Sequence, residues 1–203
     1  DESLACGGTL ARLADEGGFF KRSLRYWIKH PNRMLTSILI ADTLVDTATL
    51  LPQEGTLYSE EGQRQRMGTT RFDRTARKAF FELRTDTTVR TDRPIPPRTQ
   101  DGLSALYSLR ANPISASTKL SVPIIDDGSL YNVTMQASGI ERVRVPLGEV
   151  TAWNVKVQIT DEAGQAVGQN IGVWISNDAK RLPVKIQAEL PVGTFALALR
   201  EAK

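Results

Sequence analysis

The chain of 203 residues has very few of the side chains that bind metals or act as nucleophiles. It contains one cysteine, Cys6, and one histidine, His30. A structural zinc site needs about four Cys or His ligands, so the chain cannot assemble one by itself. An internal disulfide is impossible, and a Cys–His nucleophilic pair would require these two residues to meet. We expect a small buried or frayed thiol at Cys6 and a polar helix-end side chain at His30 instead.

The acidic residues and glycines also lack the patterns of an active site. Asp126-Asp127 and Asp161-Glu162 lie in predicted hairpin turns, where turn geometry alone explains them. The glycine-rich stretch "GQAVGQNIG" is not followed by the helix start that a phosphate-binding loop requires. We therefore expect no catalytic residue, no metal and no cofactor, and a protein that is not an enzyme.

Long apolar runs and a strong net charge are absent as well. No uninterrupted apolar stretch reaches about 18 residues, so no complete transmembrane helix is expected. The formal net charge of +3 is too small to indicate a nucleic-acid partner. The chain begins "DESLACGG", with no basic segment before an apolar run, so no signal peptide is visible and we interpret the start as a processed or truncated end.

The charge is nevertheless uneven along the chain. Residues 64–98 hold ten basic residues against four acidic ones. The simpler interpretation is a set of solvated strand faces and turns. The alternative is a basic patch that meets an anionic envelope surface such as lipid headgroups. The basic residues are Arg64, Arg66, Arg71, Arg74, Arg77, Lys78, Arg84, Arg90, Arg93 and Arg98.

Residues 8–48 show a spacing typical of helices. Apolar residues recur three and four positions apart, and Gly17-Gly18 and Pro31 interrupt the pattern. Pro52 and Gly55 end it. We therefore predict a helical N-terminal segment over residues 1–45, separate from the remainder of the chain. The apolar positions are Leu10, Leu13, Leu24, Trp27, Ile28, Met34, Leu35, Ile38, Leu39 and Leu44.

From about residue 56 the apolar period changes to two, which predicts strands. "TAWNVKVQIT" alternates over four pairs, and "DDGS" between two apolar runs is a strong hairpin turn. One helix near 101–111 interrupts the strands, with Asp101 as its N-cap. The predicted fold of residues 46–203 is thus mainly β: an antiparallel meander forming a curled sheet or a partly open barrel.

Three separated motifs in residues 44–203 resemble a family of exported bacterial proteins, domain of unknown function 3108. They are "RFDRTARKAFFE", the Asp-x-x-Ser-x-x-Tyr-x-x-Arg helix in "PPRTQDGLSALYSLR", and "GVWISNDAKRLPVKIQAELPVGTFALAL". The resemblance implies a β-rich, partly closed barrel on the periplasmic side of the envelope and no established activity. The residues that carry it are Phe72, Asp73, Asp101, Ser104, Tyr107, Arg110, Trp174, Asp178 and Pro183.

The first 40 or so residues resemble a different family. "LARLADEGGFFKRSLRYWIKHPNRMLTSILI" is similar to part of the transmembrane domain of CorC and cyclin-M type magnesium/cobalt transport proteins. The likeness ends at "ADTLVD", where that family would read Gly-Asn-x-x-Val-Asn, so no ion site transfers to this chain. The two resemblances meet at a seam near Ala41.

These observations support two main hypotheses of function. The first is a non-enzymatic periplasmic or envelope-associated protein that binds an apolar ligand, such as a lipid, or another envelope protein. The alternative is a membrane-associated fragment related to CorC-type transport proteins, with membrane contact through residues 8–45. A hydrolase whose site the sequence does not reveal is a third hypothesis.

Overall fold

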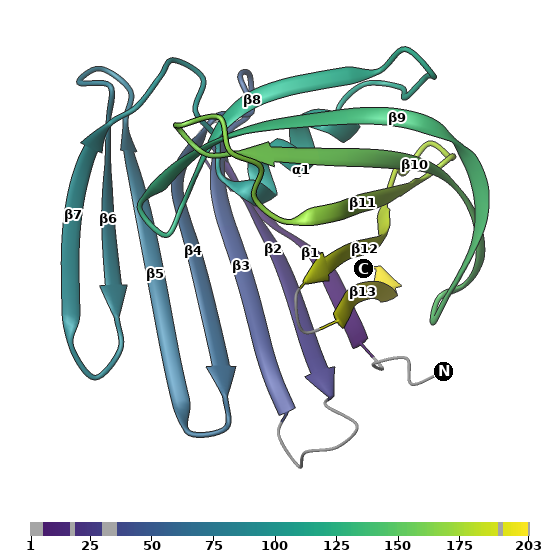
Figure 1. The fold of residues 1–203 in the computed structure, drawn as a ribbon, viewed down its shortest axis with the longest axis horizontal. Helices are drawn as coiled ribbons and strands as arrows, with labels where there is room; N and C mark the ends of the chain where they lie inside the picture. The colour runs from purple at the N-terminus through teal and green to yellow at the C-terminus, as the bar shows by residue number, and fades with distance from the viewer. Residues whose placement is uncertain (1–5, 17–18, 30–35, 191–192, 203) are drawn as a thin grey trace.

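The computed structural model describes residues 6–16, 19–29, 36–190 and 193–202, which form strands and one helix (Figure 1). The first seven strands are β1 (Cys6–Glu16), β2 (Phe19–Lys29), β3 (Thr36–Asp46), β4 (Pro52–Glu61), β5 (Arg64–Asp73), β6 (Lys78–Arg84) and β7 (Thr88–Pro94). Helix α1 (Gly102–Arg110) precedes β8 (Lys119–Asp126), β9 (Ser129–Val145), β10 (Gly148–Thr160), β11 (Gln169–Ser176), β12 (Pro183–Leu190) and β13 (Gly193–Ala202).

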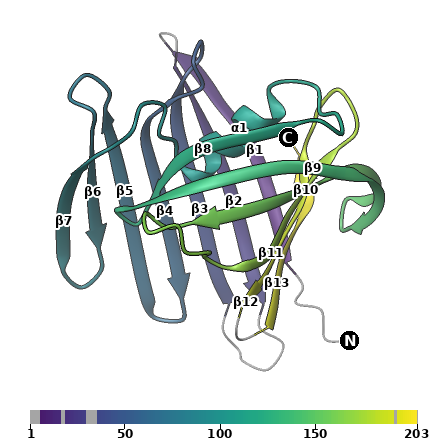
Figure 2. The ribbon, with the colours of Figure 1, turned by 45° about the horizontal axis from the view of Figure 1, so that its top comes forward.

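The strands form two antiparallel meanders that are joined side by side. The order is β7-β6-β5-β4-β3-β2-β1-β13-β12-β11-β10-β9-β8, and the join is a parallel pair between β1 and β13. The second meander arches over the first, with α1 enclosed between them (Figures 1 and 2). The predicted mainly β fold with a curled sheet and one short helix is therefore confirmed.

The sheet of the described residues does not close into a barrel, because its end strands β7 and β8 do not pair. The connector between β7 and α1 partly bridges them. The Ile95 N–H donates to the Arg77 carbonyl on one side at 2.9 Å. On the other side, Gln100 N–H donates to the Pro123 carbonyl and Ile125 N–H donates to the Gln100 carbonyl, both at 2.9 Å.

The predicted helical segment over residues 1–45 is corrected by the structure, in which the described part of it forms β1, β2 and most of β3. Leu24 pairs with Ala41, which pairs with Leu57, so β3 continues the first meander without a break. The run Ile38 to Ala41 is apolar at every position, which obscures the period of two and leaves spacings of three and four to suggest a helix. The expected seam near Ala41 lies within β3. His30 and Pro31 lie outside the described residues.

The main core lies between α1 and the inner faces of both meanders. Leu103, Leu106 and Leu109 of α1 are buried against valines and isoleucines of the second meander, and Leu39 and Ala41 of β3 pack on the same cluster. A smaller cluster contains Phe72, Ala79, Ile95 and Ile125. Within the described residues, no helix has the length and apolar character needed to cross a membrane.

Candidate functional site

A cavity of about 130 Å³, about half open to solvent, lies where the N-terminus of α1 meets the inner face of β3 to β6. The turn between β8 and β9 covers it from the other side. Its apolar lining consists of Ala41, Leu57, Phe81, Leu103 and Ile125. The carboxylate-bearing residues at the same cavity are Asp42, Asp101, Asp126 and Asp127, and its glycines are Gly55, Gly68 and Gly102.

Asp101 caps the N-terminus of α1, which forms one end of the cavity. Its Oδ1 accepts the Ser104 N–H at 2.7 Å, and the Ser104 Oγ accepts the Asp101 N–H at 3.1 Å, which completes a capping box. Its Oδ2 accepts the Thr43 hydroxyl of β3 at 2.7 Å. The carboxyl group is enclosed although the residue as a whole is partly exposed, and this burial raises the pKa of Asp101 above its ordinary value.

Gly55 of β4 leaves the space that the Asp101 carboxyl occupies. A Cβ at position 55 would lie 2.9 Å from the Asp101 Oδ2, which is closer than real Cβ atoms approach. The pairing of Thr43 with Gly55 in adjacent strands brings the donor and the space to the same point. The bond from the Thr43 hydroxyl to the Asp101 carboxyl therefore links α1 to β3, and the absence of a side chain at Gly55 leaves space for that carboxyl.

The turn between β8 and β9 covers one side of the cavity, and an ion pair and hydrogen bonds link it to the first meander. Asp127, at φ 47°, forms an ion pair of 2.5 Å with Arg66 of β5. Arg93 of β7 donates to the Gly128 carbonyl at 3.3 Å and to both Glu162 oxygens at 2.6 Å. Two turns of the second meander are therefore fastened to β5 and β7.

Burial and the neighbouring Asp127 raise the pKa of Asp126, while Arg66 acts in the opposite direction. The residue as a whole is exposed at the start of the turn, and the pKa of its carboxyl lies above the ordinary value for aspartate. Across the described residues, no group of three or more His, Cys, Asp or Glu side chains is arranged to hold a metal ion.

The C-terminus of α1 is held by the loop between β11 and β12. Arg181 donates from Nε to the Arg110 carbonyl at 2.7 Å and from a terminal nitrogen to the Ala111 carbonyl at 3.3 Å. Arg110 donates in return to the Lys180 carbonyl at 2.5 Å. Asp178 shapes the loop, because its Oδ1 accepts from the Ser176 hydroxyl at 2.8 Å and from the Lys180 N–H at 2.9 Å.

The family residues therefore divide between the cavity and the framework. Asp101 and Ser104 form the helix cap at the cavity, and Arg110 and Asp178 lie at the opposite helix end. The others lie elsewhere. Phe72 is buried under the Arg74 guanidinium, Tyr107 is buried beneath that of Arg110, and Asp73 accepts the Ala76 N–H in the turn after β5. The Trp174 indole N–H donates to Glu141, the Lys185 Nζ lies 4.5 Å from the centre of the Trp174 ring, and Pro183 is buried at the start of β12.

Three important site residues, Thr43, Gly55 and Arg66, carry no signal in a single sequence. Their partners Asp101 and Asp127 lie 46 or more positions away along the chain. A threonine, glycine or arginine inside a strand is ordinary by itself. Only the pairing of β3 with β4 and the return of the β8–β9 turn onto β5 give these residues a common location.

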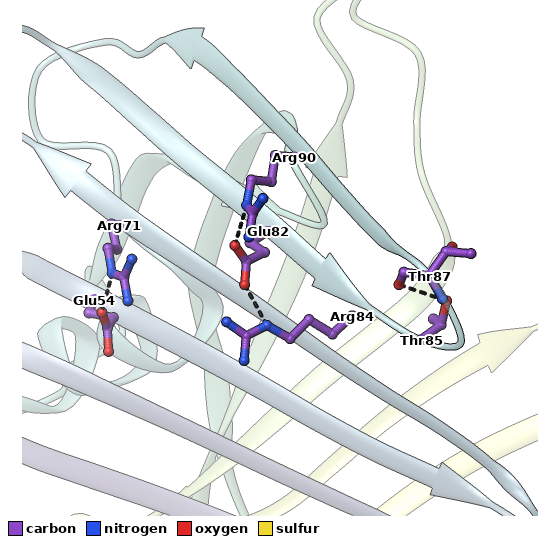
Figure 3. A network of polar contacts seen from close by, with 7 residues as sticks. All are labelled: Glu54, Arg71, Glu82, Arg84, Thr85, Thr87 and Arg90. Carbon is purple, nitrogen blue, oxygen red and sulfur yellow. Dashed lines mark hydrogen bonds and ion pairs between the residues drawn. The ribbon is translucent and has the colours of Figure 1, made fainter.

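Residues 64–98 comprise β5 to β7 and the first part of the connector after β7, and most of the basic side chains in this stretch are paired with carboxylates. Glu82 accepts from Arg84 and from Arg90, each at 2.5 Å, and Glu54 accepts from Arg71 at 2.7 Å (Figure 3). Six of the ten basic residues form ion pairs with carboxylates. This matching favours the interpretation as a solvated face over a patch for anionic lipid.

The fold and the cavity define a mainly β protein with a helix packed inside a curled, open sheet. Its sequence matches the family described as "Protein of unknown function (DUF3108)" over residues 32–200, and the chain belongs to that family. No curated protein and no solved structure shows significant similarity to it. The match begins before Ala41 and continues through it, and the resemblance of the N-terminal residues to CorC-type proteins is not supported.

Proposed function

We propose that the chain is a non-enzymatic protein of the bacterial envelope that holds a small apolar ligand, or the apolar end of a larger one, in the cavity under α1. The observation that carries the proposal is the cavity itself. Leu57, Phe81 and Leu103 give it apolar walls, and its volume is about 130 Å³. An enclosed cavity of about 150 Å³ lined by Leu, Ile and Phe holds one benzene molecule, so a site of about 130 Å³ suits a group of about that size or smaller.

The carboxylates restrict which ligands fit. An ionised carboxylate only accepts hydrogen bonds, and a protonated one donates a single bond. A ligand whose polar end carries a hydroxyl or amine donor would therefore be favoured over one that carries a carboxylate. The Asp101 oxygens already accept bonds from Thr43 and Ser104, and Asp127 is paired with Arg66, so Asp126 is a carboxyl of this cavity that such a donor could reach.

The non-enzymatic and envelope parts of the proposal have separate support. The family residues Asp101, Ser104 and Asp178 take part in a helix cap and a loop, which are structural tasks. The envelope location is supported by the resemblance of the three motifs to exported bacterial proteins.

The experiment is a titration with benzene, indole and a short alkyl alcohol, followed by calorimetry. Gly68→Ala and Gly68→Val add volume at the cavity, where a Cβ would lie 3.2 Å from the Phe81 ring. Gly139→Val is the matched control, because a Cβ at that strand position has nothing within 4 Å. We expect graded weakening in the Gly68 series, at least about tenfold for valine, which corresponds to about 1.4 kcal/mol.

Circular dichroism establishes that each variant is folded before it is titrated. The control should bind as the unchanged protein does. The proposal is overturned if none of the probes binds the unchanged protein, or if folded Gly68→Val binds as tightly as Gly139→Val.

A further inference from the structure

Strand β7 ends the sheet and leaves one edge open. Among the described strands only β6 pairs with it, and every residue of β7 except Arg93 is exposed. Both views show this edge at the border of the molecule (Figures 1 and 2). An exposed strand edge presents unpaired N–H and C=O groups that another strand can use.

The hydrogen bonds at both ends of the β6–β7 hairpin determine which groups face outward. Ile95 N–H donates to the Arg77 carbonyl, and Thr85 N–H donates to the Thr87 carbonyl at 2.8 Å. Hydrogen-bonded pairs alternate along an antiparallel ladder. The odd-numbered residues of β7 therefore bond to β6, and Thr88, Arg90 and Asp92 direct their N–H and C=O groups to the open edge.

The sequence of this edge is complementary to itself. If two copies of β7 run antiparallel with Thr91 opposite Thr91, then Arg90 of each copy lies opposite Asp92 of the other. Both residues direct their backbone groups outward, so each such pair exchanges two backbone hydrogen bonds. Pro94, which has no N–H, lies opposite Thr88 at the end, where its carbonyl still accepts the Thr88 N–H.

Neighbouring registers lack this complementarity. A shift that preserves the outward pairing places Arg90 opposite Arg90 in one direction and Asp92 opposite Asp92 in the other. Directly opposed like charges destabilise a sheet, and opposed unlike charges stabilise it. The charges of β7 therefore select one register from those that the backbone allows.

We propose that β7 is a self-association edge, at which two copies of the chain pair antiparallel about a two-fold axis through Thr91. Such an interface is isologous, because the same surface is used on both copies. It adds one strand pair and little further area, which places it among small, concentration-dependent interfaces. The proposal is independent of the cavity and its ligand.

Sedimentation equilibrium of the full chain between about 10 μM and 1 mM tests the proposal, a range suited to weak association. We expect monomer and dimer in exchange. Arg90→Asp replaces both cross-copy attractions with repulsions and should weaken the dimer about tenfold or more. Arg90→Asp combined with Asp92→Arg restores opposite charges across the axis and should return dimerisation to within a few-fold.

The double exchange distinguishes an effect on the interface between copies from an effect on ion pairs within one chain. Within one chain, Arg90 binds Glu82 and Asp92 binds Lys78 (Figure 3 shows the first pair). Both internal pairs are lost in the double variant, so a recovery of the dimer cannot come from them. Arg144→Asp is the matched control, since Arg144 is an exposed charge of β9 in the other meander, and this variant should dimerise normally.

A cross-link provides the second readout. Thr91→Cys in a Cys6→Ser background should form a disulfide between copies under mild oxidation, because facing residues of a non-hydrogen-bonded pair lie about 4.5 Å apart between Cα atoms. The proposal is overturned if the chain remains monomeric at 1 mM, or if the double exchange dimerises no better than Arg90→Asp.

Discussion

Replacement of Gly55 by alanine tests how α1 is held to the sheet. The added Cβ would lie 2.9 Å from the Asp101 Oδ2, and an ordinary contact begins near 3.4 Å, so the carboxyl must withdraw by about 0.5 Å. Because Oδ1 accepts the Ser104 N–H at 2.7 Å and Oδ2 accepts the Thr43 hydroxyl at 2.7 Å, this withdrawal stretches both bonds. Loss of an N-cap costs about 1 kcal/mol, and a hydrogen bond to a charged group contributes about 1.5 kcal/mol.

We therefore expect Gly55→Ala to lower the free energy of unfolding by about 2 kcal/mol, measured by urea denaturation, and the melting temperature by about 4–8 °C. Gly102→Ala is the control, since a Cβ there has nothing within 4 Å and lies in the first turn of α1. It should stabilise by about 0.5–1 kcal/mol.

A double-mutant cycle identifies the contact responsible. In an Asp101→Ala background the new methyl group no longer meets a carboxyl, so Gly55→Ala should cost under about 0.5 kcal/mol there. The reasoning is refuted if Gly55→Ala leaves stability unchanged, or if its cost is the same with and without the Asp101 carboxyl.

Three further changes probe the rest of the framework. Because burial raises the pKa of Asp101 in the folded state, this one carboxyl contributes unfolding free energy that increases as the pH falls through its folded-state pKa; Asp101→Asn should remove that contribution, at most about 1.4 kcal/mol per pH unit, in urea denaturation at each pH. Arg181→Ala removes the donors to the Arg110 and Ala111 carbonyls and should cost about 1–2 kcal/mol, with unaltered stability as the contrary result. Arg93→Gln should change stability by under about 1 kcal/mol but accelerate hydrogen exchange in the turn around Glu162, whereas unchanged exchange would show that this ion pair does not restrain the turn.

Local chemistry made the helix and hairpins predictable. Asp101 followed three residues later by Ser104 gives a capping box, and the observed helix Gly102–Arg110 begins directly after that cap. Asp127 and Gly128, at φ 47° and 74°, form the tight turn that the Asp-Gly sequence favours. In each case the determining residues lie within a few positions of one another.

The N-terminal strands and the cavity depend on contacts that local patterns do not encode. Ile38 to Ala41 are apolar on both faces of β3, so their spacing fits a helix as well as a strand, and only pairing with β2 and β4 decides between them. Thr43 and Gly55 meet Asp101 across 58 and 46 positions, respectively, which no short motif records.

The most direct test of the proposed function is a methyl-resolved NMR titration of the full chain with benzene. The cavity account predicts that the largest shifts occur at Leu57, Leu103 and Ile125, which line the cavity, and that Gly68→Val suppresses them. The methyl groups of Ile140, which is exposed on β9, should remain unchanged. Saturable shifts confined to residues outside the cavity, or an absence of saturable shifts, would contradict the account.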